Sequence, residues 1–78
     1  MNKSDINYKN VVGSKVRALR VNAALSQEVL SDRCGIFRTY LSRIESGSAN
    51  PTLVVLVSLA QSLTVEPHVL LVLEKPET

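Results

Sequence analysis

A single glycine, Gly35, separates two short segments in which apolar residues recur at helical spacing. Leu30 and Cys34 lie four residues apart before it, and Leu41 and Ile44 lie three residues apart after it. Glycine readily takes the positive φ of a tight turn that follows a helix. The pattern predicts two helices of about eight residues joined by a short turn, and this pairing constrains the fold more than any other feature.

Capping residues indicate where these two helices begin and end. Ser26 is a favourable N-cap for the first helix. The second is expected to start near Phe37 and to end at Ser46 and Gly47. Together the two segments form a helix-turn-helix pattern.

A longer helix is expected before this pair, from about residue 10 to Ala23. Val12, Val16 and Leu19 follow one another at spacings of four and three, and they share one apolar stripe with Ala23. No such periodicity is present in residues 1–9, which are predicted to form a flexible N-terminal arm.

Two more helices are expected after the pair. Asn50 is predicted to cap a fourth helix with Pro51 at its first position. Its inward face is expected to carry Leu53, Leu56, Ala60 and Leu63. Pro67 is expected to open a fifth helix that runs to about Leu73. The sequence therefore predicts one compact, all-α domain of five helices over residues 10–74, with a tail at 75–78.

The composition excludes several classes of site. One domain is all that 78 residues support. The chain has one cysteine, Cys34, and one histidine, His68, which argues against an internal disulfide and against a metal site. The N-terminus lacks the apolar stretch of a signal peptide, and apolar runs are too short to span a membrane. A cytoplasmic protein without a cofactor is expected.

Charge is unevenly distributed along the chain. Residues 1–50 contain eight Lys and Arg against four Asp and Glu, whereas residues 51–78 contain one Lys against three Glu. A basic front half suits a polyanionic partner. Charge alone does not separate this interpretation from a chance imbalance on a small surface.

Five short elements follow one another in a fixed order: Ser26-Gln27-Glu28, Leu30-Ser31, Gly35-Ile36, Ile44-Glu45-Ser46-Gly47 and Asn50-Pro51-Thr52-Leu53. In this order they resemble the Cro/phage-repressor helix-turn-helix family, also called the XRE family, over residues 25–70. The resemblance implies a lambda-repressor-like domain that binds double-stranded DNA and regulates transcription. The chain departs from the family pattern where Ala24 replaces a turn glycine, Ser31 an alanine, and Phe37 a Ser or Thr cap. The entry to the fifth helix, at Thr64 and Pro67, also differs from the usual one.

The resemblance also implies which residues bind DNA. The helix that starts near Phe37 would lie in the major groove, with Arg38, Thr39, Ser42 and Arg43 pointing outward to base edges. Gln27 matches the family's phosphate-contacting glutamine. Tyr40 is expected either to reach a phosphate or to pack on the domain surface. Lys15 is expected to attract phosphates without sequence preference, although a plain solvated charge is the preferred account of each lysine taken alone.

Two charged positions match a structural pair of the family. An arginine late in the first helix, Arg20, is expected to pair with the glutamate that closes the reading helix, Glu45. Such a pair would hold the reading helix at its angle, and removal of one partner would leave a buried charge unpaired.

More apolar residues occur in the last two helices than one domain of this size is expected to bury. Val54, Val55, Val69, Leu71 and Val72 are the candidates for a dimer interface. A two-fold homodimer would place its reading helices about 34 Å apart, one turn of DNA, and would recognise a palindromic operator. The alternative is that these residues pack on the chain's own tail.

An enzyme is not expected, because no nucleophile–base arrangement and no phosphate-binding loop is present. The competing function is a protein-interaction module, such as an antitoxin whose main partner is a protein. Restriction-modification controllers, phage regulators and antitoxins all remain open, with a weak preference for controllers from Arg38-Thr39-Tyr40. No small-molecule effector is expected, because the chain has no room for an effector domain.

Overall fold

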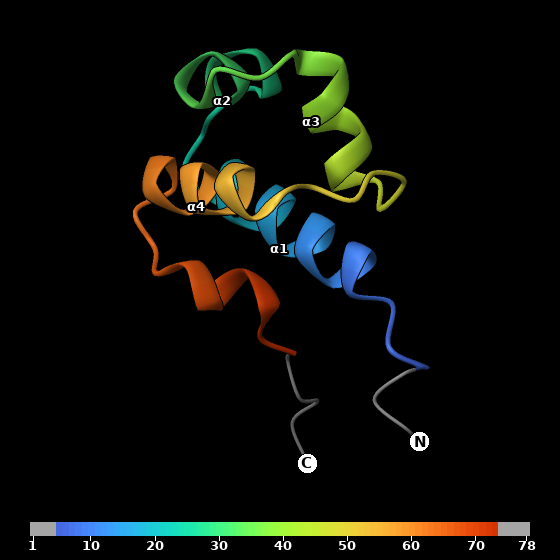
Figure 1. The fold of residues 1–78 in the computed structure, drawn as a ribbon. Coiled ribbons are helices and arrows are strands. Elements are labelled where there is room, and N and C mark those ends of the chain that lie inside the picture. Colours follow the sequence, from blue (N-terminus) through green and yellow to red (C-terminus); the bar gives the residue numbers. More distant parts are fainter. Residues whose placement is uncertain (1–4, 74–78) are drawn as a thin grey trace.

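The computed structural model describes residues 5–73 as an all-helical unit. Its elements are α1 (Tyr8–Asn22), α2 (Gln27–Cys34), α3 (Arg38–Glu45), α4 (Leu53–Ser62) and the 3₁₀ helix η2 (Pro67–Leu71). Figure 1 shows α2 and α3 at one end of the molecule and η2 at the other, with α1 and α4 between them. α1 contacts both α3 and η2, and α4 contacts both α2 and η2.

α1 begins two residues earlier than the apolar stripe indicated. The side chain of Asn7 caps it, because its Oδ1 accepts hydrogen bonds from the backbone amides of Lys9 at 3.1 Å and Asn10 at 3.3 Å. Tyr8 and Lys9 therefore belong to the first turn of α1, where the sequence predicted an arm. Residues 1–4 of the expected arm lie outside the described residues.

The α2–turn–α3 segment has the expected local chemistry. Ser26 Oγ accepts from the amide of Val29 at 3.1 Å and so caps α2. Gly35 adopts φ +68°, the left-handed conformation that ends a helix without side-chain strain. Phe37 occupies the N-cap of α3 and makes no side-chain capping hydrogen bond.

α4 begins after Thr52 and not at Pro51, so the prediction of its start was wrong. Thr52 Oγ1 accepts from the amide of Val55 at 3.2 Å, and this bond makes Thr52 the cap in place of Asn50. Ala60 and Leu63 of the predicted inward face are buried, but the first residue of that face is not. Leu53, predicted to face the core, is 75% exposed, while Leu59 is completely buried.

The expected fifth α-helix is a short 3₁₀ helix. Its backbone bonds join residues three apart: Val69 N donates to Glu66 O at 3.0 Å, and Val72 N donates to Val69 O at 3.3 Å. The domain therefore has four α-helices over its described residues, and not the five that the sequence predicted. The predicted tail at 75–78 lies outside those residues.

The core lies where the four α-helices and η2 meet. It is aliphatic, and its buried members are Val12, Val16, Leu30, Leu41, Ile44, Ala49, Leu59, Ala60, Leu63 and Leu70. Gly13 is buried where α1 crosses the end of α3. A Cβ on Gly13 would overlap the carbonyl oxygen of Ile44 and would lie 2.9 Å from that of Glu45. This glycine lets the two backbones approach more closely than any other residue would allow.

Candidate nucleic-acid interface

α3 divides cleanly into a buried and an exposed side. Leu41 and Ile44 are completely buried, and they fix the rotation of the helix about its axis. The four residues expected to contact bases, Arg38, Thr39, Ser42 and Arg43, are all exposed. Residues three or four apart in a helix share one side, so Arg38 and Thr39 lie on the same outward half as Ser42 and Arg43.

Arg20 of α1 and Glu45 at the end of α3 form a two-pronged ion pair. Arg20 Nε lies 2.6 Å from Glu45 Oε2, and Arg20 Nη2 lies 3.0 Å from Glu45 Oε1. The side chains are only 12% and 4% exposed. The hydrogen bond to Glu45 and its negative charge raise the pKa of Arg20, although burial opposes them. A third donor, Nη1, binds Leu25 O at 2.8 Å and so ties the pair to the turn before α2.

Gln27 extends this pair into a network that reaches the exposed side of α3. Its Nε2 donates to Glu45 Oε1 at 3.1 Å, and its Oε1 accepts from Arg38 Nη1 at 3.4 Å. The amide therefore joins the closing residue of α3 to its first residue. This arrangement connects α1, α2 and α3 through side chains at the surface expected to face DNA.

A polar hollow of about 260 Å³ lies beside this network. It is lined by Arg17, Arg20, Gln27, Ser42, Glu45 and Ser46. Arg17 is exposed and was not among the sequence-predicted contacts. The sequence could have identified Arg17 as a candidate contact, because it lies three residues before Arg20 and so shares one side of α1 with it.

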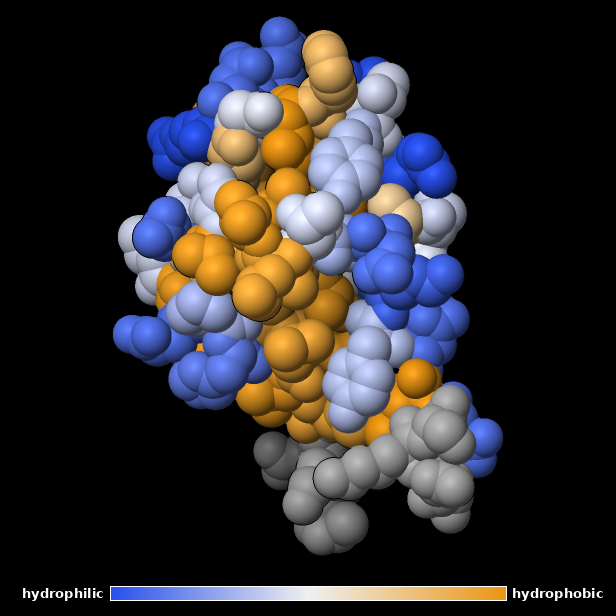
Figure 2. All heavy atoms as spheres, in the orientation of Figure 1, coloured by the Kyte–Doolittle hydropathy of each residue, from blue (hydrophilic) through white to orange (hydrophobic). Residues whose placement is uncertain are grey.

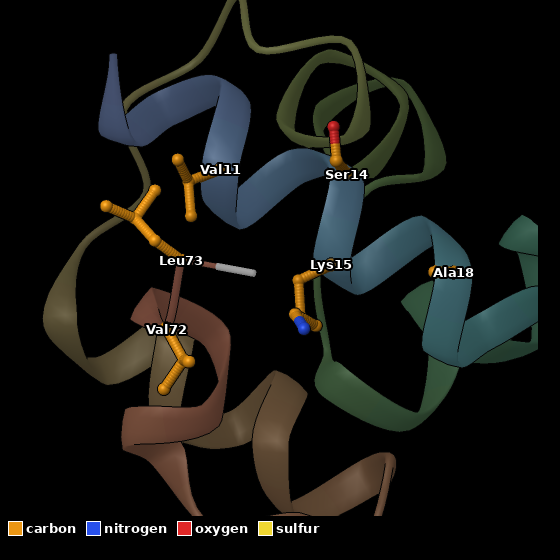
Figure 3. Close-up of a pocket in the computed structure, with 6 residues that line it drawn as sticks. All are labelled: Val11, Ser14, Lys15, Ala18, Val72 and Leu73. Atoms are coloured by element: carbon orange, nitrogen blue, oxygen red, sulfur yellow. The ribbon is translucent and has the colours of Figure 1, made fainter. Parts of the chain in front are cut away.

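The other two residues expected to contact phosphates are less favourably placed than Gln27: Lys15 lies apart from it, and Tyr40 is partly covered. Lys15 faces another side of α1, where it lines a groove of about 330 Å³ with Val11, Val72 and Leu73. Figure 3 shows Val72 and Leu73 lying across from α1 on this side of the molecule. Tyr40 is half-buried and packs against the core. The structure therefore brings Gln27 close to the exposed side of α3 but does not bring Lys15 there.

Apolar side chains form a separate surface away from this polar network. Figure 2 shows them as a band on the face that displays α4 and η2. Among the residues expected at a dimer interface, Val54 is 78% exposed, and Leu71 and Val72 are also exposed. Val55 and Val69 are half-buried within their own chain. Leu53, which the sequence assigned to the core, adds to this surface because its side chain is 75% exposed.

Residues 5–73 contain no helix that is long and apolar enough to cross a membrane. Within the same residues there is no group of three or more His, Cys, Asp or Glu side chains that is placed to hold a metal ion.

Comparison with known proteins gives consistent results from sequence and structure. Residues 11–72 match the model of a family described as a helix-turn-helix domain. The chain is 41% identical over 73 residues to an uncharacterised HTH-type transcriptional regulator of Sinorhizobium fredii, covering 94% of each protein. It is 38% identical over 66 residues to the control protein C.BamHI of Bacillus amyloliquefaciens, covering 83% of this chain and 82% of that protein.

A solved structure with a similar fold is the restriction-modification controller protein C.AhdI of Aeromonas hydrophila. The two structures superpose with a TM-score of 0.77 at 37% sequence identity, covering 80% of this chain and 94% of the controller.

Proposed function

The chain belongs to the helix-turn-helix domain family, and from this premise we propose that α2 and α3 are its DNA-binding unit and that α3 enters the major groove. The protein is a transcription regulator of the same type as its relatives. The proposal concerns how it binds: through base contacts from α3, as a homodimer, on a palindromic operator.

The observation that carries this proposal is the exposed side of α3. Two arginines, a threonine and a serine project from a helix whose opposite side is completely buried. A major groove about 12 Å wide accommodates such a helix. Arg38 and Arg43 are the natural partners of guanine, because a guanidinium donates two parallel hydrogen bonds to O6 and N7. Thr39 and Ser42 serve as shorter donors and acceptors.

Backbone contacts hold the helix in register without reading sequence. Gln27 is the main candidate for a phosphate contact, since its side chain bridges Arg38 of α3 and the ion pair between α1 and α3. Lys15 keeps the role proposed from the sequence, long-range attraction of phosphates. Tyr40 keeps both alternatives, a hydroxyl contact to phosphate or packing alone, and it does pack against the core. Their positions make them secondary to Gln27.

The homodimer is supported by the exposed apolar surface on α4 and η2. Leu53 and Val54 on α4 and Leu71 and Val72 at the end of η2 expose more apolar surface than isolated surface residues account for. We assign this surface to a two-fold interface that includes the partly buried Val55 and Val69. Two α3 helices about 34 Å apart then match successive major grooves on one side of the duplex.

A more specific function within this class is control of a restriction-modification system. Similarity to the control protein C.BamHI and to the restriction-modification controller C.AhdI supports it, at 38% and 37% identity over most of each chain. A protein-interaction role, such as that of an antitoxin, is the alternative, and the experiment below separates it from DNA recognition.

The test begins with selection of binding sites from a random duplex pool by the whole chain. The selected duplex is then titrated by fluorescence anisotropy at several salt concentrations with the wild type, Arg43→Ala and Arg43→Lys. The lysine variant is the matched control, because it keeps the positive charge but loses the planar two-donor fork.

Two results together support the proposal. The selected site is an inverted repeat, and both variants lose roughly 1–3 kcal/mol of the binding free energy that discriminates one base pair in each half-site. If Arg43→Ala retains full discrimination between base pairs, the assignment of Arg43 to a base is wrong. If no sequence is enriched and weak binding merely declines with salt, the basic surface provides only general attraction. The protein-interaction alternative is then favoured.

A further inference from the structure

Phe37 is the most exposed large apolar side chain in residues 5–73, with 85% of its surface accessible. Its neighbours Ile36 and Tyr40 pack against the core. Phe37 instead projects from the N-cap of α3, immediately before Arg38 and Thr39. The aromatic ring therefore stands at the start of the helix surface that we assign to base contacts.

Nothing in the local fold requires an aromatic residue at this position. The backbone of Phe37, at φ −70° and ψ 144°, closely matches that of Ser26 and Thr52, the caps of α2 and α4. Both of those residues accept a backbone hydrogen bond through their hydroxyl groups, at 3.1 and 3.2 Å. Phe37 accepts none, so α3 lacks a stabilising contact that the two neighbouring helices have.

A residue that both exposes a ring to water and leaves a helix uncapped is better explained by binding than by stability. The major groove offers one apolar group, the C5-methyl of thymine, and a phenylalanine side chain is among the groups that contact it. Protein partners need a much broader apolar surface. The molecule presents such a surface on α4 and η2, whereas Phe37 is followed in sequence by the exposed polar residues Arg38 and Thr39.

We propose that Phe37 is a specificity-determining residue that buries the C5-methyl group of one thymine in each half-site. This inference rests on the proposed insertion of α3 into the major groove. It adds a preference for thymine, through apolar contact, to the guanine contacts assigned to the arginines.

Deoxyuridine provides a direct test, because it pairs like thymidine and lacks only the methyl group. Each thymine of the selected operator is replaced in turn by deoxyuridine, symmetrically in both half-sites. Dissociation constants are measured by anisotropy for the wild type, Phe37→Ala and Phe37→Ser. Val21→Ser is the matched control, since it truncates an apolar side chain that is 58% exposed at the far end of α1.

At one thymine position, the wild type and Val21→Ser should lose roughly fourfold in affinity per half-site when the methyl group is removed. Phe37→Ala and Phe37→Ser should bind the two duplexes equally at that position. Phe37→Ser should also raise Tm by roughly 4–8 °C, because the new hydroxyl caps α3. That increase would show that the variant remains folded while it loses discrimination.

If the deoxyuridine scan is the same for the wild type and both Phe37 variants, Phe37 does not contact a thymine methyl and the inference is wrong. In that case the Arg43 results with the same operator still decide the proposed function independently. If the wild type selects no operator at all, the proposed function and this inference fail together.

Discussion

The carboxylate of Glu45 receives two hydrogen bonds from the guanidinium of Arg20, at 2.6 and 3.0 Å, and thereby ties the last residue of α3 to α1. Gln27 adds a third hydrogen bond to the same carboxylate. The C-terminal end of α3 is thus held by side chains from two other helices. We regard this pair as the element that sets the orientation of the proposed reading helix.

Replacing Arg20 with alanine should destabilise the domain by about 3–5 kcal/mol, because Glu45 would be left buried without its main partner. This is a large part of the roughly 5–15 kcal/mol that stabilises an ordinary domain. Urea unfolding of Arg20→Ala, Glu45→Ala and the double variant measures the coupling. A cost below about 1 kcal/mol for each single variant would contradict a structural role for the pair.

The raised pKa of Arg20 predicts that this contribution does not weaken at alkaline pH. A cation whose pKa is higher in the folded state stabilises the fold fully below its unfolded-state pKa, and the effect is lost only as pH rises through the folded-state value. Arg20→Lys should therefore lose stability relative to the wild type as pH passes about 10–11, where lysine deprotonates. Parallel thermal scans from neutral pH upward detect the difference, and superimposable pH profiles would contradict it.

Gly13→Ala should destabilise the domain by about 1–3 kcal/mol or more, since its new methyl group would collide with the backbone carbonyl of Ile44. The matched control is Ser14→Ala, on the next residue of α1, whose side chain is exposed. We expect that control to be neutral or slightly stabilising, because alanine is the better helix former. Equal Tm values for Gly13→Ala and the wild type would show that α1 can move away from α3 without cost.

Ala24 adopts φ +59°, a left-handed conformation that costs an L-residue about 1–2 kcal/mol. Ala24→Gly should therefore stabilise the domain by roughly 0.5–1 kcal/mol, after the larger chain entropy of glycine is deducted. The neighbouring Ala23 has φ −85°, so Ala23→Gly should destabilise it instead. Opposite shifts in Tm for these two variants are the expected result, and shifts of the same sign would contradict the argument.

Val54→Glu should convert the proposed homodimer to a folded monomer. Val54 is 78% exposed in the first turn of α4, where a carboxylate interacts favourably with the helix dipole, so the change should not unfold the chain. Sedimentation velocity of the wild type, Val54→Glu and the control Val21→Glu measures the assembly directly. A wild type that sediments as a monomer at high concentration, or a Val54→Glu variant that remains dimeric, would rule out this interface.

Local chemistry alone was sufficient for the segment that defines the family. Ser26 and Gly35 act through their own backbone neighbours, so the bounds of α2 followed from residue type. The resemblance to helix-turn-helix regulators, confirmed by the family match over residues 11–72, rests on the same local pattern of caps, turn and apolar spacing. The exposure of Arg38 and Arg43 also follows from the apolar spacing, because Leu41 and Ile44 fix the buried side of α3.

Tertiary structure decided what depends on distant residues. The apolar spacing of α4 assigned Leu53 to the core, but the packing of α4 against its neighbours leaves Leu53 75% exposed. Counting charges along the sequence did not show that Arg17 lies beside α3 while Lys15 does not. The two side chains face different sides of α1. The close approach of Gly13 to α3 and the bridge made by Gln27 also depend on how helices cross. Sequence periodicity reports which side of a helix is apolar, whereas the packing of that side against other elements determines which residues finally meet.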